Sequence, residues 1–290
     1  MTTINAIIQG ILLGGLYALF ACGLSLMFGV MRIANLAHGD LAVLGAFMVS
    51  TIATHAGVSA WIALIIVLPG AAVVGVALQR GILDRALRAG ELPPLLATFG
   101  LAIVIQNALL EIFTADARSI DAGPIQTASW SVGSQIAIPK FGVLVLVIAV
   151  LVLGSLQLFL SRNRVGRQMR ATADDLDTAG LVGIDAKAIY AIASAIAVAT
   201  AALAGTFFAM RSTFEPTSGP TQLIFAFEAV AIGGLGSIWG TLAGGIILGV
   251  TQAVVGEINP AYAILSGHLL FLLVLAFRPR GIFAARQVRA

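Results

Sequence analysis

The chain has 290 residues, of which 59% are hydrophobic and 10% are charged, with a formal net charge of +3 and a mean hydropathy of +1.03. Soluble domains have a charged fraction of roughly a quarter, so the composition excludes an ordinary soluble domain. The three histidines and the single cysteine show no metal-ligand spacing, so we expect no metal site. The composition predicts a polytopic membrane protein.

Long apolar runs follow one another along the whole chain. Most are close to the roughly 20 residues that cross a bilayer, which predicts about eight membrane-crossing helices, within a range of about seven to nine. The second run is short and the seventh is broken by glycines, and no loop is long enough for a soluble domain. We therefore predict one all-α transmembrane domain over residues 1–290. The runs cover residues 4–30, 38–54, 60–79, 93–114, 141–160, 188–210, 221–256 and 261–277.

Basic residues gather in loops at alternate ends of these runs. Of the 16 arginines and lysines, 13 lie in such loops, which the positive-inside rule assigns to the cytoplasm. This bias predicts an amino terminus outside the cell and a carboxyl terminus in the cytoplasm. Nucleic-acid binding is a poor alternative, because the basic residues cluster at membrane borders. They are Arg32, Arg80, Arg85, Arg88, Arg162, Arg164, Arg167, Arg170, Lys187, Arg278, Arg280, Arg286 and Arg289.

Two segments interrupt the apolar pattern, residues 31–47 with several polar side chains and residues 226–245 with several glycines. Broken helices persist in a membrane only where they line a cavity or are covered by protein. We therefore predict broken or re-entrant elements in both segments and interpret both as parts of a translocation pathway. The candidate pathway residues are Asn35, His38, Asp40, Glu228, Gly233, Gly234, Gly236 and Ser237.

Each polar candidate also has a structural interpretation. A carboxylate inside a spanning segment costs about 2.5–3.5 kcal/mol on insertion scales, so Glu228 either serves a pathway or bonds a neighbouring helix or opened backbone. Asn35 is placed to cap the helix that follows, and Asp40 would put negative charge in its first turn. Gln106, Asn107, Glu111, Gln252 and His268 are isolated polar groups, for which hydrogen bonding between helices is a sufficient explanation.

The sequence gives little support to enzymatic chemistry. It contains no G-x-x-x-x-G-K-[ST] segment that could cradle a nucleotide, so we expect no cofactor on this chain. Ser237 lies in Gly-Leu-Gly-Ser-Ile and not in a G-x-S-x-G elbow, and we predict no catalytic residue. Energy for transport would then come from another subunit or from an ion gradient.

A charged segment, residues 162–187, separates two of the apolar runs. Within it, apolar or small residues recur at a period close to 3.6, which predicts a short surface helix from Gly166 to Val182 that ends at Gly183. Asp174, Asp175 and Asp177 would lie on its exposed side. The helix would either enter a groove on a partner or rest on the membrane surface. The periodic residues are Met169, Ala173, Leu176, Ala179 and Val182.

Four stretches together resemble the permease subunits of ABC importers for branched-chain amino acids, specifically the H-subunit type. The Asn-Leu-Ala-His-Gly-Asp element within the first stretch is particularly similar to the H type and differs from the sister M subunit. The stretches are GLYALFACGLSLMFGVMRIANLAHGDLAVLGAF (residues 15–47), GRQMRATADDLDTAGLVGID (166–185), AIGGLGSIWGTLAGGIILG (231–249) and FRPRGIF (277–283).

The resemblance implies an ABC importer permease fold in a bacterial inner membrane and a transport subunit rather than an enzyme. The implied partners are a second permease of the M type, two cytoplasmic ATPases that hold ATP and Mg, a periplasmic substrate-binding protein and membrane lipid. Residues 166–185 would be the cytoplasmic coupling helix that docks on an ATPase. Its candidate coupling residues are Gly166, Arg170, Ala171, Asp174, Asp175, Ala179 and Gly183.

The implied cargo is a branched-chain or other hydrophobic amino acid. Urea, short amides or other small solutes are the alternative cargoes. A stand-alone channel, a secondary transporter and a membrane-embedded enzyme are the alternative protein classes.

Overall fold

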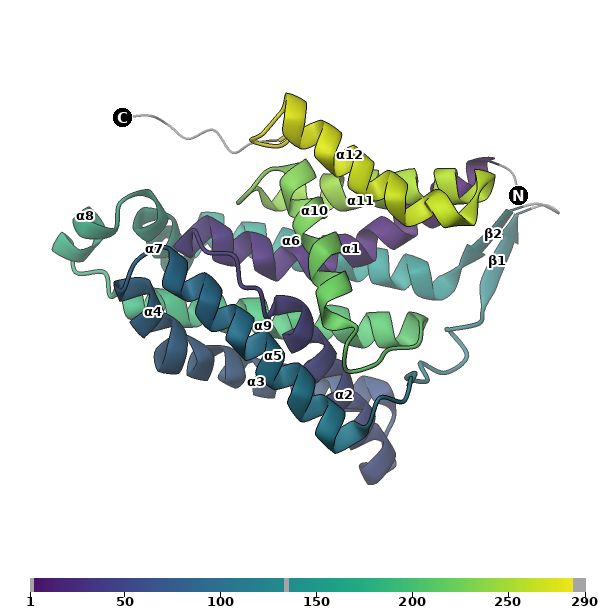
Figure 1. Ribbon diagram of the computed structural model, residues 1–290, viewed down its shortest axis with the longest axis horizontal. Helices are drawn as coiled ribbons and strands as arrows, with labels where there is room; N and C mark the ends of the chain where they lie inside the picture. Colours follow the sequence, from purple (N-terminus) through teal and green to yellow (C-terminus); the bar gives the residue numbers. More distant parts are fainter. Residues whose placement is uncertain (1–2, 133–135, 284–290) are drawn as a thin grey trace. The chain divides into compact units, whose positions relative to one another are not determined.

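The computed structural model describes residues 3–132 and 136–283 (Figure 1). Within them, eight helices are long and apolar enough to cross a membrane, as the sequence predicts. The elements are α1 (Thr3–Met31), α2 (His38–Ala56), α3 (Ala60–Leu78), the π-helical turn η1 (Gln79–Leu83), α4 (Asp84–Arg88), α5 (Leu92–Phe113), β1 (Ser129–Val132), β2 (Ile136–Pro139), α6 (Lys140–Arg162), α7 (Arg164–Asp174), α8 (Leu176–Leu181), α9 (Ala186–Arg211), α10 (Gly219–Gly233), α11 (Ile238–Ile258), the 3₁₀ turn η2 (Pro260–Tyr262) and α12 (Ala263–Phe277).

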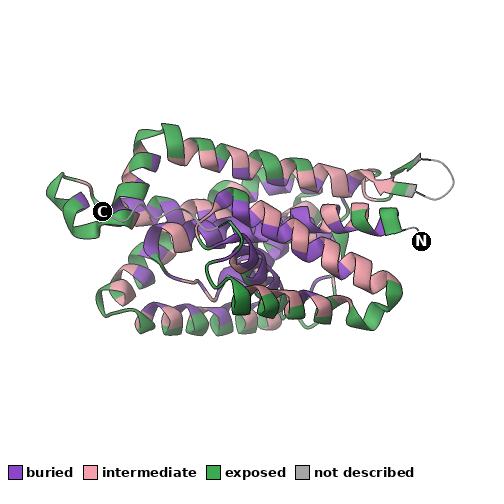
Figure 2. Ribbon diagram, turned by 90° about the horizontal axis from the view of Figure 1, so that it is seen from above, coloured by how far each residue is buried: buried purple, intermediate pink, exposed green. Residues whose placement is uncertain are grey.

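The long helices differ in how much of their surface the chain itself covers. Helix α1 is apolar around its whole circumference and is largely buried, whereas in α12 Gly267 alone of the helix's residues is buried (Figure 2). A helix that is apolar on all sides needs an apolar environment on all sides. The exposed leucines of α12 therefore require lipid or another apolar surface.

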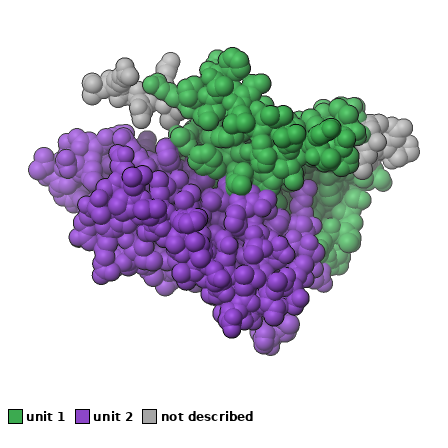
Figure 3. Space-filling view, in the orientation of Figure 1, with its two compact units in different colours: residues 1–21, 123–154, 224–290 green, residues 22–122, 155–223 purple. Residues whose placement is uncertain are grey.

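The chain divides into two compact units, coloured separately in Figure 3. Unit 1 comprises residues 1–21, 123–154 and 224–290, and unit 2 comprises residues 22–122 and 155–223. Helices α1, α6 and α10 each contribute to both units. The single domain over residues 1–290 stays a prediction.

Glycines bring α1 and α11 together in unit 1. A side-chain carbon at Gly14 would lie 2.6 Å from the carbonyl oxygen of Gly245, and one at Gly10 would lie 2.8 Å from that of Gly249. Small residues at four-residue spacing let helix backbones approach closely in lipid. These glycines therefore serve packing.

Helices α2, α3 and α9 form the core of unit 2 in the same manner. Gly45 of α2 faces Ala202, Gly75 of α3 faces Ser194, and Gly205 of α9 faces Ala42. The α3 helix continues through the π turn into α4, which the apolar run over residues 60–79 did not predict.

Strands β1 and β2 form a two-stranded antiparallel hairpin, with Trp130 opposite Ile138. The Lys140 Nζ lies 5.4 Å from the ring centroid of Trp130, within the range of a cation–π contact. The hairpin belongs to unit 1.

Candidate functional site

The first interruption of the apolar pattern is a six-residue break between α1 and α2. Arg32, which follows α1, has a φ of 56°, and residues 32–37 are not helical. The Asn35 Oδ1 accepts a hydrogen bond from Ala37 N at 3.0 Å, and Leu36 N donates to Thr98 Oγ1 at 3.2 Å. Side chains thus hold the backbone of this break.

The predicted cap at Asn35 is wrong in its position. The residue before α2 is Ala37, and it makes no side-chain cap bond. Asn35 instead closes a turn onto the backbone two residues ahead, a common role of asparagine in turns. Asp40 does lie in the first turn of α2, as expected.

His38 and Asp40 are almost completely buried, at 0% and 1% exposure. The Asp40 Oδ1 accepts a hydrogen bond from Gln106 Nε2 of α5 at 2.9 Å. Gly219, at the start of α10, leaves room for the Asp40 carboxylate, because a side-chain carbon there would lie 2.7 Å from its Cγ. Gly23 likewise leaves room for the His38 ring. These contacts, all within unit 2, fasten α2 to its neighbours.

The second interruption separates α10 from α11 in unit 1. Gly234 and Gly236 have φ values of 114° and 77°, a conformation that residues with a side chain rarely adopt. The Ser237 Oγ caps α11 by accepting a hydrogen bond from Gly240 N at 3.1 Å. The backbones of Gly233 and Gly240 are in close contact. The helix therefore breaks where the glycines predict it.

The tail segment, residues 278–283, covers the open end of α10. Ile282 N donates to Ile232 O at 2.9 Å, and Phe283 N donates to Gly233 O at 3.0 Å. Gly281 has a φ of 80°, and a side-chain carbon there would lie 2.5 Å from Gly234 N. The last carbonyls of a helix have no partner within it. Here two backbone N–H groups of the tail supply the missing partners of two such carbonyls.

A polar cluster lies beside this second break, formed by Tyr17, Phe225, Glu228, Gln252 and His268. The Glu228 carboxylate pairs with His268 Nδ1, and Tyr17 donates to Gln252 Oε1 at 2.6 Å. The Phe225 ring lies 5.0 Å from Tyr17 and 6.2 Å from His268, measured between centroids. The cluster brings together helices α1, α10, α11 and α12 within unit 1.

Two atoms of the polar cluster still offer hydrogen bonds. Glu228 and Gln252 are 3% and 4% exposed, and within the described chain neither Glu228 Oε2 nor Gln252 Nε2 has a partner. An unsatisfied buried polar atom costs about 1–3 kcal/mol. A polar molecule that accepts from the amide or donates to the carboxylate would therefore be stabilised here.

The candidate pathway residues fall into two groups. Asn35, His38 and Asp40 belong to unit 2, and the other five belong to unit 1. Their role in a pathway stays a prediction. Sequence reasoning treated Gln252 and His268 only as isolated polar groups. Tyr17 carried no signal, because aromatic residues are common in apolar helices. Phe225 stands out only by the resemblance, because many members of the resembled family have a lysine near this position.

The charged segment contains two helices, so the single helix predicted over residues 166–182 is wrong. Asp175, with a φ of −150°, ends α7 and caps α8. Its Oδ1 accepts from the backbone N–H groups of Asp177 and Thr178 at 3.0 and 3.1 Å, and its Oδ2 accepts from the Thr178 hydroxyl at 2.6 Å. The hydrogen bonds from Thr178 and Asp177 lower the pKa of Asp175.

The candidate coupling residues do not all face solvent. Gly166 packs on the backbone of Leu160, and Ala179 is buried, so these two serve the chain's own packing. Gly183 has a φ of 83° just after α8, as expected for a helix end. The exposed candidates are Arg170, Ala171, Asp174, Asp175 and Gly183. Asp177 is exposed as predicted.

Comparison with known proteins gives consistent matches along the whole chain. The family model described as "Branched-chain amino acid transport system / permease component" matches residues 6–277. The permease protein BraD of a high-affinity branched-chain amino acid transport system of Pseudomonas aeruginosa is 31% identical over 300 residues, covering 98% of this chain and 97% of BraD.

Two relatives from Escherichia coli represent the H and M types. LivH is 28% identical over 294 residues, covering 97% of this chain and 95% of LivH. LivM is 25% identical over 291 residues, covering 92% of this chain and 67% of LivM. Both are high-affinity branched-chain amino acid transport system permease proteins, and the H type matches more completely.

The helix pattern and these matches confirm a multi-pass membrane protein and a transport component rather than an enzyme. They also confirm the resemblance to the H type. The chain belongs to the family of permease components of branched-chain amino acid transport systems.

Proposed function

We propose that this chain is the H-type permease subunit of an ATP-driven importer, which carries branched-chain or other hydrophobic amino acids across a bacterial inner membrane. The observation that carries the proposal is the nearly full-length similarity to BraD, a permease protein of a high-affinity branched-chain amino acid transport system. The chain itself holds no nucleotide motif, so ATP and Mg would be bound by partner ATPases.

The proposed assembly contains this chain, an M-type permease, two cytoplasmic ATPases and a periplasmic substrate-binding protein, all within or beside membrane lipid. The distribution of basic residues supports a periplasmic amino terminus and a cytoplasmic carboxyl terminus. Residues 166–185 would then face the ATPases.

The exposed side chains of that segment support an ATPase-docking role. Leu181 and Val182 are 87% and 72% exposed, and Leu176 is 47% exposed. Apolar side chains at such exposure are typical of a surface that a partner covers. Asp174 adds an exposed charge that such a partner would meet.

Charge reversal tests this docking role. Asp174→Lys should weaken co-purification of the ATPase while preserving α8, because Asp174 is not the cap residue. Asp175→Lys should weaken it further, since it also removes the cap. Unchanged co-purification of both variants would contradict docking at this segment.

The proposed pathway uses the two broken segments. Glu228 Oε2 would accept from the ammonium group of an amino acid, and Gln252 Nε2 would donate to its carboxylate. Gly233, Gly234, Gly236 and Ser237 would let α10 and α11 change their angle, because glycine adopts the required backbone conformations without strain. Asn35, His38 and Asp40 are the other candidate pathway residues of the proposal.

The cargo is tested by uptake into proteoliposomes that contain the whole complex, with ATP inside and the binding protein outside. We expect radiolabelled leucine, isoleucine and valine to be taken up, and urea and acetamide to be excluded. Uptake of urea or acetamide in place of leucine would overturn the amino-acid assignment. Vesicles that contain a complex with an inactive ATPase are the control.

A further inference from the structure

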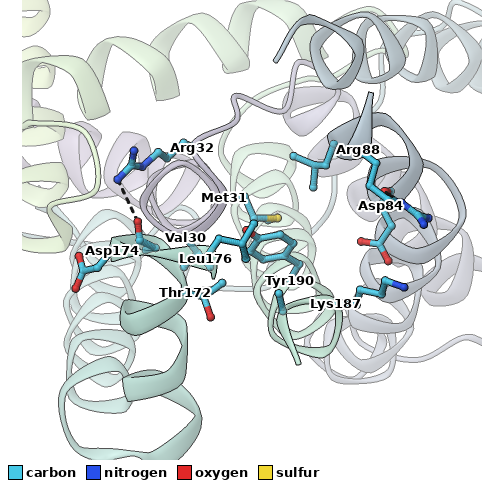
Figure 4. Close-up of a pocket in the computed structure, with 13 residues that line it drawn as sticks. Val30, Met31, Arg32, Asp84, Arg88, Thr172, Asp174, Leu176, Lys187 and Tyr190 are labelled. Atoms are coloured by element: carbon cyan, nitrogen blue, oxygen red, sulfur yellow. Dashed lines mark hydrogen bonds between the residues drawn. The ribbon is translucent and has the colours of Figure 1, made fainter. Parts of the chain in front are cut away.

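A cavity of about 420 Å³ lies in unit 2, apart from the proposed pathway residues (Figure 4). Its wall is formed by the end of α1, by α4, by α7 and the start of α8, and by the start of α9. The side chains of α7 and α8 in this wall, from Thr172 to Leu176, belong to the charged segment. The cavity therefore joins that segment to three other helices of the same unit.

Charged groups of both signs line the cavity. The cations are Arg32, Arg88 and Lys187, and the carboxylates are Asp84 and Asp174. Between them lie apolar and aromatic side chains, among them those of Met31 and Tyr190, which Figure 4 shows near the centre of the view. The lining thus combines a charged rim with an apolar surface.

Asp84 is held in place by a chain of polar contacts. The Gln79 Nε2 donates to Asp84 Oδ1 at 2.8 Å, and Ser194 donates to Gln79 Oε1 at 2.6 Å. Gln79 is fully buried and begins the π turn, a type of turn that is frequent at functional sites. One carboxylate oxygen is therefore fixed, and the other can accept a hydrogen bond from a ligand.

We infer that this cavity is a second binding site for a free amino acid with an apolar side chain, distinct from the pathway. The ammonium group would bind Asp84, the carboxylate would bind Arg88 or Arg32, and the side chain would lie against Met31 and Tyr190. The inference rests on the proposed function, because import would release amino acids on the cytoplasmic side, to which the arginine-rich loops are assigned.

A phospholipid headgroup is the competing occupant, since basic pockets at the membrane boundary bind anionic lipids. Two carboxylates in the lining, Asp84 and Asp174, would repel a phosphate group. A zwitterion carries one charge of each sign and so complements both the carboxylates and the cations of the lining. A pocket of this size with a few polar groups is also typical of small-molecule sites.

Occupancy of the site would restrain the charged segment. Arg32 already donates to Ala173 O at 3.1 Å, which links the break after α1 to α7. A ligand that contacts Arg32, Asp84 and the wall of α7 at once would strengthen this link. Because the segment is the proposed ATPase contact, the transported amino acid would slow its own import.

The test measures binding of radiolabelled leucine to the purified complex in lipid nanodiscs, without binding protein or nucleotide. We expect saturable binding that neither 4-methylpentanoate nor 3-methylbutylamine displaces at the same concentration, because each lacks one of the two charges. Asp84→Asn and Arg88→Gln should each weaken binding about tenfold, the effect of losing one charged hydrogen bond.

Arg85→Gln is the matched control. Arg85 and Arg88 are both exposed, lie on α4 and donate to a backbone carbonyl four residues earlier, but Arg88 alone of the two lines the cavity. Arg85→Gln should leave leucine binding unchanged.

The absence of saturable leucine binding would overturn the inference, and so would equal leucine binding by the Asp84, Arg88 and Arg85 variants. Native mass spectra give a third such outcome, a bound phospholipid that is lost in Arg88→Gln and kept in Arg85→Gln. Inhibition of ATP hydrolysis by leucine on the ATPase side, lost in Arg88→Gln, would support it. If leucine uptake were normal but leucine did not bind at this cavity, the further inference would be wrong and the proposed function would stand. If leucine uptake were absent, the proposed function itself would be contradicted.

Discussion

The two helix breaks of this chain are stabilised in different ways. In the break between α1 and α2, the side chains of Asn35 and Thr98 bond the backbone directly. In the break between α10 and α11, glycines adopt conformations closed to other residues, and the backbone of the tail segment bonds the open end of α10. The first break depends on side-chain chemistry. The second depends mainly on the absence of side chains, with the Ser237 cap of α11 as its one side-chain bond described above.

This difference predicts different responses to mutation. Side-chain contacts in the first break can be removed one at a time, each at the cost of a hydrogen bond. The second break has no spare volume, because Gly233, Gly240 and Gly281 are in contact with other backbone. Any added side chain there must displace a helix or the tail.

The largest effect is expected at the ion pair beside the second break. His268→Ala leaves the buried Glu228 carboxylate without its partner, and an uncompensated buried charge costs about 3–5 kcal/mol. We expect a lower unfolding temperature of the purified complex and loss of uptake. The double variant His268→Ala with Glu228→Gln should recover part of the stability, and simple additivity of the two changes would argue against the pairing.

The next largest effect concerns the glycine contact. Gly233→Ala places a methyl group on the backbone of Gly240 and should destabilise the chain by about 3 kcal/mol. Gly100→Ala is the control, because a side-chain carbon at Gly100 of α5 would meet no atom of another element within 4 Å. It should be neutral or stabilise the chain by up to about 1 kcal/mol. The measurement is the thermal unfolding temperature of the two variants. Equal temperatures would contradict the close backbone contact at the second break.

A smaller effect is expected in the first break. Asn35→Ala removes one hydrogen bond to Ala37 N and should cost about 1 kcal/mol. If Asn35→Ala proved as damaging as Gly233→Ala in the same unfolding assay, side-chain stabilisation would be the wrong description of this break.

The smallest effect is expected in the charged segment, outside the membrane. The pKa of Asp175 is lowered by its hydrogen bonds, so its cap on α8 is present above the ordinary aspartate pKa and is lost as the pH falls through the lowered value. The protection factors of the amides of residues 176–181, which compare each exchange rate with the intrinsic rate at the same pH, should therefore fall in acid and in Asp175→Ala. Asp177→Asn, which is not the cap residue, should exchange as the parent does.

Much of the fold follows from the sequence, because membrane spans are set by local apolar length. The eight spans and the break at Gly234 and Gly236 are of this kind. The pairs Glu228 with His268 and Tyr17 with Gln252 join residues 40 and 235 positions apart, so no local pattern indicates them. The division at Asp175 was missed because the apolar period runs on through the capping residue.

The candidate site was predicted only in part, because local sequence patterns mark unusual segments and not the contacts between them. Polar and glycine residues inside apolar runs indicate that a segment is unusual, and they identified both breaks. They do not indicate which side chains meet there. The role of Asn35 as a turn former and the contribution of the tail segment to α10 both depend on backbone geometry, which the residue types alone leave open.

The most direct test of the central claim is accumulation of radiolabelled leucine by proteoliposomes that contain the full complex, with and without ATP. We expect the internal leucine concentration to exceed the external one only when hydrolysable ATP and the binding protein are both present. Accumulation by vesicles that contain this chain alone, without ATPase subunits, would contradict the account.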